Sequence, residues 1–94
     1  MLAMAYTSVT ITAPSSAKEG EQVSVFVTIK NASLYGALFR AEISAVFLIG
    51  TIEKFLGPKE SLTRSASFTM PGANTTISVW VWSWEFDYVT HTLC

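Results

Sequence analysis

The chain has 94 residues, of which half are hydrophobic and only 14% are charged. This length suits one domain with one core, so we expect a single domain over residues 1–94. Six basic and seven acidic residues give a formal net charge of −1, and the basic residues stand singly along the sequence. The lack of a basic cluster argues against nucleic-acid binding and against charge-driven attachment to anionic membranes.

The cysteine and the apolar segments bear on three further features, namely disulfides, a signal peptide and a membrane span. Cys94 is the one cysteine, so no disulfide can form within the chain. Residues 1–5 contain no basic segment followed by an apolar one, so no signal peptide is visible in the sequence. The longest apolar run, residues 45–49, is far too short to cross a bilayer. We therefore expect no membrane span.

Alternating polar and apolar residues predict strands in the first half of the chain. Residues 7–12 alternate and are rich in β-branched side chains, and residues 14–20 contain the proline and glycine of a turn. Residues 22–30 are the clearest strand, with Phe26 as the one apolar residue on its polar face. The apolar face of that strand consists of Val23, Val25, Val27 and Ile29.

The stretch over residues 38–49 is less regular. Residues 38–44 alternate like a one-sided strand, whereas residues 45–49 are apolar without a period. Such a run fits either a bulge or a strand that is covered on both faces. A helix over residues 38–48 is the alternative, but the apolar residues are not confined to one helical stripe. We therefore predict strand structure here.

The second half of the chain continues the strand pattern. Residues 51–56 are expected to form an edge strand, and residues 59–70 alternate again. Residues 71–74, Pro-Gly-Ala-Asn, are a strong turn signal. Residues 75–93 must hold either two strands or one long bent strand, and we place the expected turn at Asp87.

Six or seven strands with turns about every ten residues, and no convincing helix, predict an all-β fold. The spacing favours an immunoglobulin-like sandwich of two sheets, in which each strand contributes one face to a shared core. The expected core residues are Val23, Val25, Val27, Ile29, Phe39, Ile43, Phe68, Ile77 and Val79.

Four segments carry a resemblance to known domains. They are V-T-I-T-A-P at 9–14, E-G-E-Q-V-S-V-F-V-T-I-K-N at 19–31, L-G-P-K-E-S at 56–61 and S-F-T-M-P at 67–71. Their order resembles the immunoglobulin-like modules of bacterial and archaeal surface proteins, including the CARDB-type adhesion domains, and similar phage and virus proteins. The resemblance implies a sandwich with a structural or adhesive role. The resemblance extends as far as Trp84, and the residues after it depart from the pattern.

The sequence contains no constellation that points to catalysis. His91 is the only histidine, and the candidate metal ligands near it are Glu85, Asp87 and Cys94. One histidine would need several partners from other strands to hold a metal, so an exposed histidine is the simpler interpretation. No Gly-x-Ser-x-Gly elbow, carboxylate pair or glycine-rich phosphate loop occurs. We therefore predict a protein with no enzymatic activity, cofactor or metal.

Two Asn-x-Ser/Thr patterns, at Asn31 and Asn74, fall in expected turns. Either asparagine could accept a glycan in a compartment that carries out N-glycosylation. Asparagine and threonine are also ordinary turn residues, so a chance occurrence is the alternative.

The most informative segment is residues 77–84, in which three tryptophans alternate with aliphatic residues. If Val79 and Val81 face the core, then Trp80, Trp82 and Trp84 stand in a row outside. Exposed tryptophan is typical of binding surfaces. The alternative is a bulge that turns some of the rings inward, or a loop that covers them.

These features lead to two hypotheses for function. The first is a non-catalytic structural or adhesion module that assembles with itself or with another structural protein, as a homo-oligomer or in a larger assembly on a virion or a cell surface. Its expected interface is Trp80, Trp82 and Trp84, with Phe26 as a weaker candidate on the other sheet. The alternative is a carbohydrate-binding module that stacks sugars on the tryptophans, with Arg40 and Glu42 of a neighbouring strand binding sugar hydroxyls.

Overall fold

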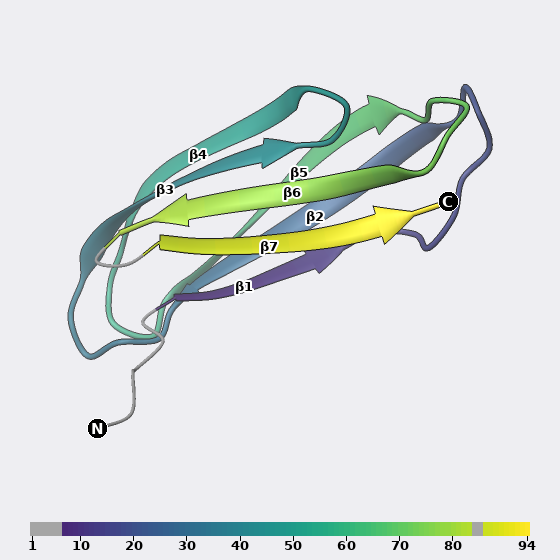
Figure 1. The fold of residues 1–94 in the computed structure, drawn as a ribbon. Helices are drawn as coiled ribbons and strands as arrows, with labels where there is room; N and C mark the ends of the chain where they lie inside the picture. Colours follow the sequence, from purple (N-terminus) through teal and green to yellow (C-terminus); the bar gives the residue numbers. More distant parts are fainter. Residues whose placement is uncertain (1–6, 84–85) are drawn as a thin grey trace.

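The computed structural model describes residues 7–83 and 86–94, which form seven strands in two antiparallel sheets (Figure 1). The strands are β1 Thr7–Thr12, β2 Gln22–Asn31, β3 Ala37–Ser44, β4 Leu48–Leu56, β5 Ser61–Thr69, β6 Thr75–Trp82 and β7 Phe86–Leu93. One sheet has the order β1-β2-β5 and the other β4-β3-β6-β7. The predicted all-β sandwich is confirmed. In the described ranges there is no helix that could span a membrane.

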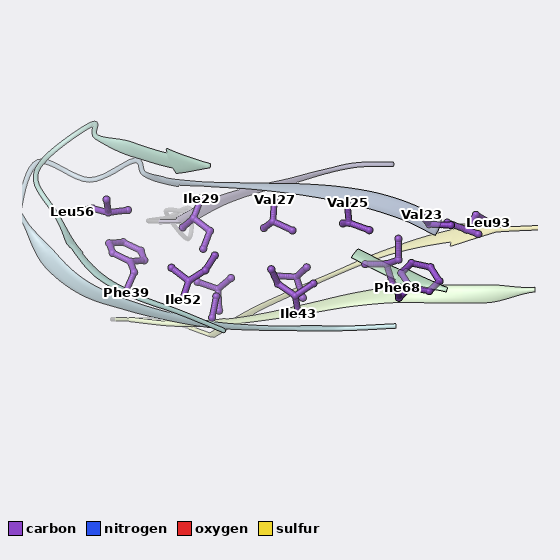
Figure 2. Close-up of a cluster of buried hydrophobic side chains, with 14 of the residues drawn as sticks. Val23, Val25, Val27, Ile29, Phe39, Ile43, Ile52, Leu56, Phe68 and Leu93 are labelled. Carbon is purple, nitrogen blue, oxygen red and sulfur yellow. The ribbon is translucent and has the colours of Figure 1, made fainter. Parts of the chain in front are cut away.

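The core lies between the two sheets and is built by alternate residues of each strand. Figure 2 shows Val25 and Val27 of β2 pointing across the core toward the opposite sheet, which carries Ile43. All nine residues of the expected core set are buried. The core also includes residues beyond that set, namely Ala41, Ile52, Leu56, Met70, Val81 and Leu93. Strict alternation in β2 and β6 therefore fixes which face of each sheet is apolar.

The aperiodic run over residues 45–49 is divided by a hairpin. β3 ends at Ser44, and β4 begins at Leu48, earlier than the predicted edge strand over residues 51–56. Residues 45–47 form the tip of this hairpin and are not strand, so the predicted strand over residues 38–49 is interrupted here, and the ladder shifts register between Ile43 and Ser44. The backbone N–H of Ala45 donates to the carbonyl of Phe47 at 2.9 Å and closes the tip of the hairpin.

The predicted turn at Asp87 is wrong. β6 ends at Trp82 and pairs with Phe86 at the start of β7, so Asp87 lies within a strand, opposite Val81. Asp87 is flanked by Phe86 and Tyr88, and the strand preference of these aromatic residues outweighs the turn preference of a single aspartate. Of the two alternatives for residues 75–93, two strands are confirmed.

Both edge strands on one side of the sandwich carry a basic residue at an inward-facing position. Lys54 of β4 lies opposite the buried Phe39, and Arg64 of β5 lies opposite the buried Val27. Directly opposed residues of an antiparallel pair project from the same face. Both basic side chains are nevertheless exposed, because an edge strand lets a long side chain reach water around the rim.

Asn31 joins the two sheets at one end of the sandwich. It ends β2, it is fully buried, and its side-chain nitrogen donates to three backbone carbonyls. The acceptors are Tyr35 at 2.7 Å, Leu56 at the end of β4 at 3.0 Å, and Gly57 at 3.1 Å. One amide thereby satisfies carbonyl groups of the segments that enter β3 and leave β4, which ties these segments to β2.

Candidate functional site

The tryptophans lie on the outer side of the four-stranded sheet. Val79 and Val81 are 0% exposed, so the alternate residues of β6 project away from the core. Trp82 is 38% exposed, and Trp80 is half-buried. The predicted orientation of these two rings is therefore confirmed, and their role in binding stays a prediction. Trp84 falls outside the described residues.

A tyrosine that the sequence pattern did not single out holds Trp80 in place. Tyr88 of β7 lies directly opposite Trp80, with ring centroids 5.1 Å apart and planes tilted by 39°. The hydroxyl groups of Tyr88 and Ser78 are 3.3 Å apart, within hydrogen-bond distance. The ring contact covers part of the Trp80 indole, while Tyr88 itself is 48% exposed. The two rings form one preorganised aromatic unit.

Charged residues of β3 flank the tryptophans in register. Arg40 lies directly opposite Trp82, and Glu42 lies directly opposite Trp80. The Arg40 Nη2 and the Glu42 Oε2 are 4.0 Å apart in an exposed ion pair, which contributes little to folding stability. Arg40, Glu42 and Trp82 line a shallow depression of about 300 Å³. The structure thus brings the two charged residues and the two indole rings together on one surface.

Two further apolar side chains extend this surface toward β4. Leu38 is 57% exposed, and Phe55 lies directly opposite it on β4 and is 61% exposed. A Cβ atom at Gly36 would lie 2.6 Å from the Phe55 Cζ, so the phenyl ring rests close to the glycine backbone. We call this surface the aromatic face, and it comprises Leu38, Arg40, Glu42, Glu53, Phe55, Trp80, Trp82 and Tyr88.

The outer side of the three-stranded sheet has a different chemistry. Its exposed positions are almost all serine or threonine, and the Thr28 and Thr63 hydroxyl oxygens are 2.9 Å apart. Phe26 is 46% exposed and lies between Thr12 and Ser65 on this side. We call this surface the hydroxyl face, and it comprises Ser8, Thr10, Thr12, Ser24, Phe26, Thr28, Ser61, Thr63, Ser65, Ser67 and Thr69. Phe26 therefore does not share a surface with the tryptophans.

Of the residues weighed as metal ligands, His91 and Cys94 contact neighbouring backbone groups, and Glu85 falls outside the described residues. The His91 Nε2 is 3.1 Å from the carbonyl oxygen of Pro14, which links β7 to the segment after β1. The backbone of Cys94 donates to Ser15 and accepts from Ala17, and its thiol belongs to an exposed residue. Within residues 7–83 and 86–94, no three His, Cys, Asp or Glu residues are grouped so that they could hold a metal.

The two asparagines of the glycosylation patterns lie in different environments. Asn31 is fully buried, and the two hydrogens of its amide nitrogen are shared among three backbone carbonyl oxygens. A glycan on that nitrogen has no room in the folded domain. Asn74 precedes β6 and is exposed. Of the two, only Asn74 presents its side chain to solvent.

Comparison with known proteins identifies the fold. No protein-family model and no curated protein matches the chain by sequence. By structure, the chain is similar to the crystal structure of a CARDB domain from Pyrococcus furiosus in complex with di-metal ions, with a TM-score of 0.81 and 17% identity over 93% of this chain and 84% of that chain. The solution structure of that domain matches with a TM-score of 0.69 and 20% identity, over 94% and 92% of the two chains.

A β-glucosidase from Listeria innocua, in complex with laminaribiose, also contains a similar unit. The TM-score is 0.52 and the identity 16%, over 94% of this chain but only 16% of the enzyme. The similarity to the CARDB domain extends over most of both chains, whereas the match to the enzyme is confined to a small part of it. The chain thus has the immunoglobulin-like fold of the CARDB domains.

Proposed function

We propose that this domain is a non-catalytic module that assembles with protein through its aromatic face, as part of a cell-surface or virion structure. The observation that carries the proposal is the group of large apolar side chains that this face exposes: Leu38, Phe55, Trp82 and Tyr88. Large apolar side chains that are grouped on one exposed face are costly to leave in water and are typical of interaction surfaces. The partner is a copy of the chain or another structural protein.

The composition of the face supports a protein partner. Tryptophan, tyrosine and arginine are the residues most enriched at interface hot spots, and the face carries all three. The contact of Trp80 with Tyr88 restricts both rings before binding, which lowers the entropy lost on association. The low overall charge, 14% of residues, fits a surface that is partly covered by another chain.

Sedimentation velocity at several protein concentrations tests the proposal. The parent is expected to associate, and Trp82→Ala is expected to weaken association more than it lowers the melting temperature. Val81→Ala is the matched control on the same strand, since Val81 is buried and should affect folding stability first. Association of Trp82→Ala that equals that of the parent would contradict the proposal.

A carbohydrate-binding module is the second candidate, and the placement of Arg40 and Glu42 favours it. Both lie opposite a tryptophan and line the depression next to Trp82. An indole ring can stack on the apolar face of a sugar while the charged groups bind its hydroxyls. A glycan screen that follows tryptophan fluorescence tests this function. Binding by a monomeric protein that is lost in Trp82→Ala and in Glu42→Gln would favour carbohydrate over protein assembly.

A further inference from the structure

The positions of the charges on the aromatic face indicate what kind of partner fits it. Each copy presents Arg40 and Glu42, two positions apart on the central strand β3, and the exposed Glu53 of β4 lies directly opposite Arg40. We propose that the aromatic face pairs with the same face of a second copy of this chain, around a two-fold axis that lies between the two faces at the level of Ala41. This inference rests on the proposed function and names its partner.

The pairing of β3 with β6 forms two rows of side chains across the sheet, which we call levels. The two-fold axis would place each level of one copy opposite the other level of the second copy. Arg40 and Trp82 form one level, and Glu42 and Trp80 form the next. A two-fold axis that lies between the faces, perpendicular to β3 at Ala41, runs the two β3 strands antiparallel and swaps the levels. Arg40 then meets Glu42 of the partner subunit, and Trp82 meets Trp80 of the partner subunit. Each contact occurs twice, as an interface between identical surfaces requires.

Charge complementarity selects this position of the axis. An axis at the level of Arg40 would place arginine on arginine, and an axis at the level of Glu42 would place carboxylate on carboxylate. Within one copy the two charged groups are 4.0 Å apart and exposed, so neither is held firmly by the other. Facing sheets pack about 10 Å apart, a gap that a long arginine side chain can cross. On dimerisation, Arg40 can therefore leave Glu42 of its own chain and pair with Glu42 of the partner subunit.

The surrounding side chains fit the same arrangement. The half-exposed rings of Trp82 and Tyr88 lie beside the charged pair and would be buried with it. Removing water around the charges strengthens their attraction, provided that each finds its partner. Self-complementarity is what a second copy requires.

A charge-reversal cycle measured by sedimentation equilibrium tests the pairing. Arg40→Glu and Glu42→Arg are each expected to weaken the dimer by about tenfold or more, because each places like charges across the interface twice. The double variant R40E/E42R restores opposite charges and is expected to recover association to within about threefold of the parent. Arg64→Glu, the same change on exposed β5, is the control and should leave the dimer unaffected.

Folding is monitored in the same samples by thermal melting at low protein concentration. If a reversal variant unfolds, Arg40→Gln and Glu42→Gln replace it, and each should weaken the dimer. A double reversal that stays as weak as the single variants would overturn the two-fold pairing. Trp82-dependent association in that case would leave the proposed function standing. A parent that is monomeric at every concentration, yet binds another protein through Trp82, would also overturn the second copy as partner and retain the proposed function.

Discussion

The aromatic face and the hydroxyl face are outer surfaces of the same sandwich, and their inner sides are alike. Val25 in β2 and Val81 in β6 are both 0% exposed. On the outside, β2 and its neighbours present mainly hydroxyl groups, which water satisfies well, together with Gln22, Phe26 and Lys30. The outer side of β6 and β3 presents rings and a charge pair. The core thus constrains only one side of each sheet, and the other side is free to carry function.

The largest expected effect comes from cutting the link between the two sheets. Asn31→Ala leaves the carbonyls of Tyr35, Leu56 and Gly57 without their buried donor, and should cost about 3 kcal/mol of folding stability. Chemical denaturation measures this loss. Asn74→Ala, at an exposed position, is the matched control and should change stability by less than about 0.5 kcal/mol. Equal effects of the two substitutions would show that Asn31 does not tie the sheets together.

A second prediction separates the two faces by their role in association. Trp82→Ala should reduce the free energy of association by about 2 kcal/mol or more, since it removes a large ring from the centre of the aromatic face. Phe26→Ala removes a ring of similar exposure from the hydroxyl face and should leave association unchanged. Light scattering at several concentrations compares the two. An equal loss in both variants would place the hydroxyl face in the interface as well.

A third prediction concerns the inner sides, where the two sheets should behave alike. Val25→Ala and Val81→Ala each remove two buried methyl groups and leave a cavity, at a cost on the order of 2 kcal/mol of folding stability. Urea unfolding of both variants checks the expected similarity. A much smaller loss at Val81 would indicate that the four-stranded sheet is packed less tightly than the other.

The smallest effects are expected from single hydroxyl groups on either face. Thr28→Val removes the contact with Thr63, and Tyr88→Phe removes the contact with Ser78. Both groups are exposed, so water replaces the lost partner, and stability should change by less than about 0.5 kcal/mol. Melting temperatures of the two variants measure this. A clear loss for Thr28→Val alone would mean that the hydroxyl pairs of that face hold its strands together.

Much of the contrast between the inner and outer sides can be predicted from the sequence, because it depends on alternation. A strand with a period of two has only two orientations, and the valines of β2 and β6 settle which side is buried. The same alternation in β6 correctly predicts that Trp80 and Trp82 project away from the core. The seven strands and the sandwich follow from the spacing of the turns.

The features that sequence patterns could not predict depend on pairing between distant segments. The contact of Tyr88 with Trp80 requires the register of β6 and β7, and that register depends on a turn whose position is ambiguous in the sequence. In the sequence, Asn31 looks like an ordinary turn residue. Its role depends on a hydrogen bond to a carbonyl 25 residues away, which the sequence alone does not show. The hairpin after Ser44 lies within an apolar run that has no period.

The inward-facing basic residues of the edge strands β4 and β5 oppose pairing with a strand of another chain. Any chain that added a strand beside β4 or β5 would have to cover Lys54 or Arg64 and strip the charge of its water. Growth by edge-to-edge addition is therefore discouraged on that side. If the aromatic face pairs with one partner, as proposed, that pair uses up the face, and the contact does not by itself build a fibre.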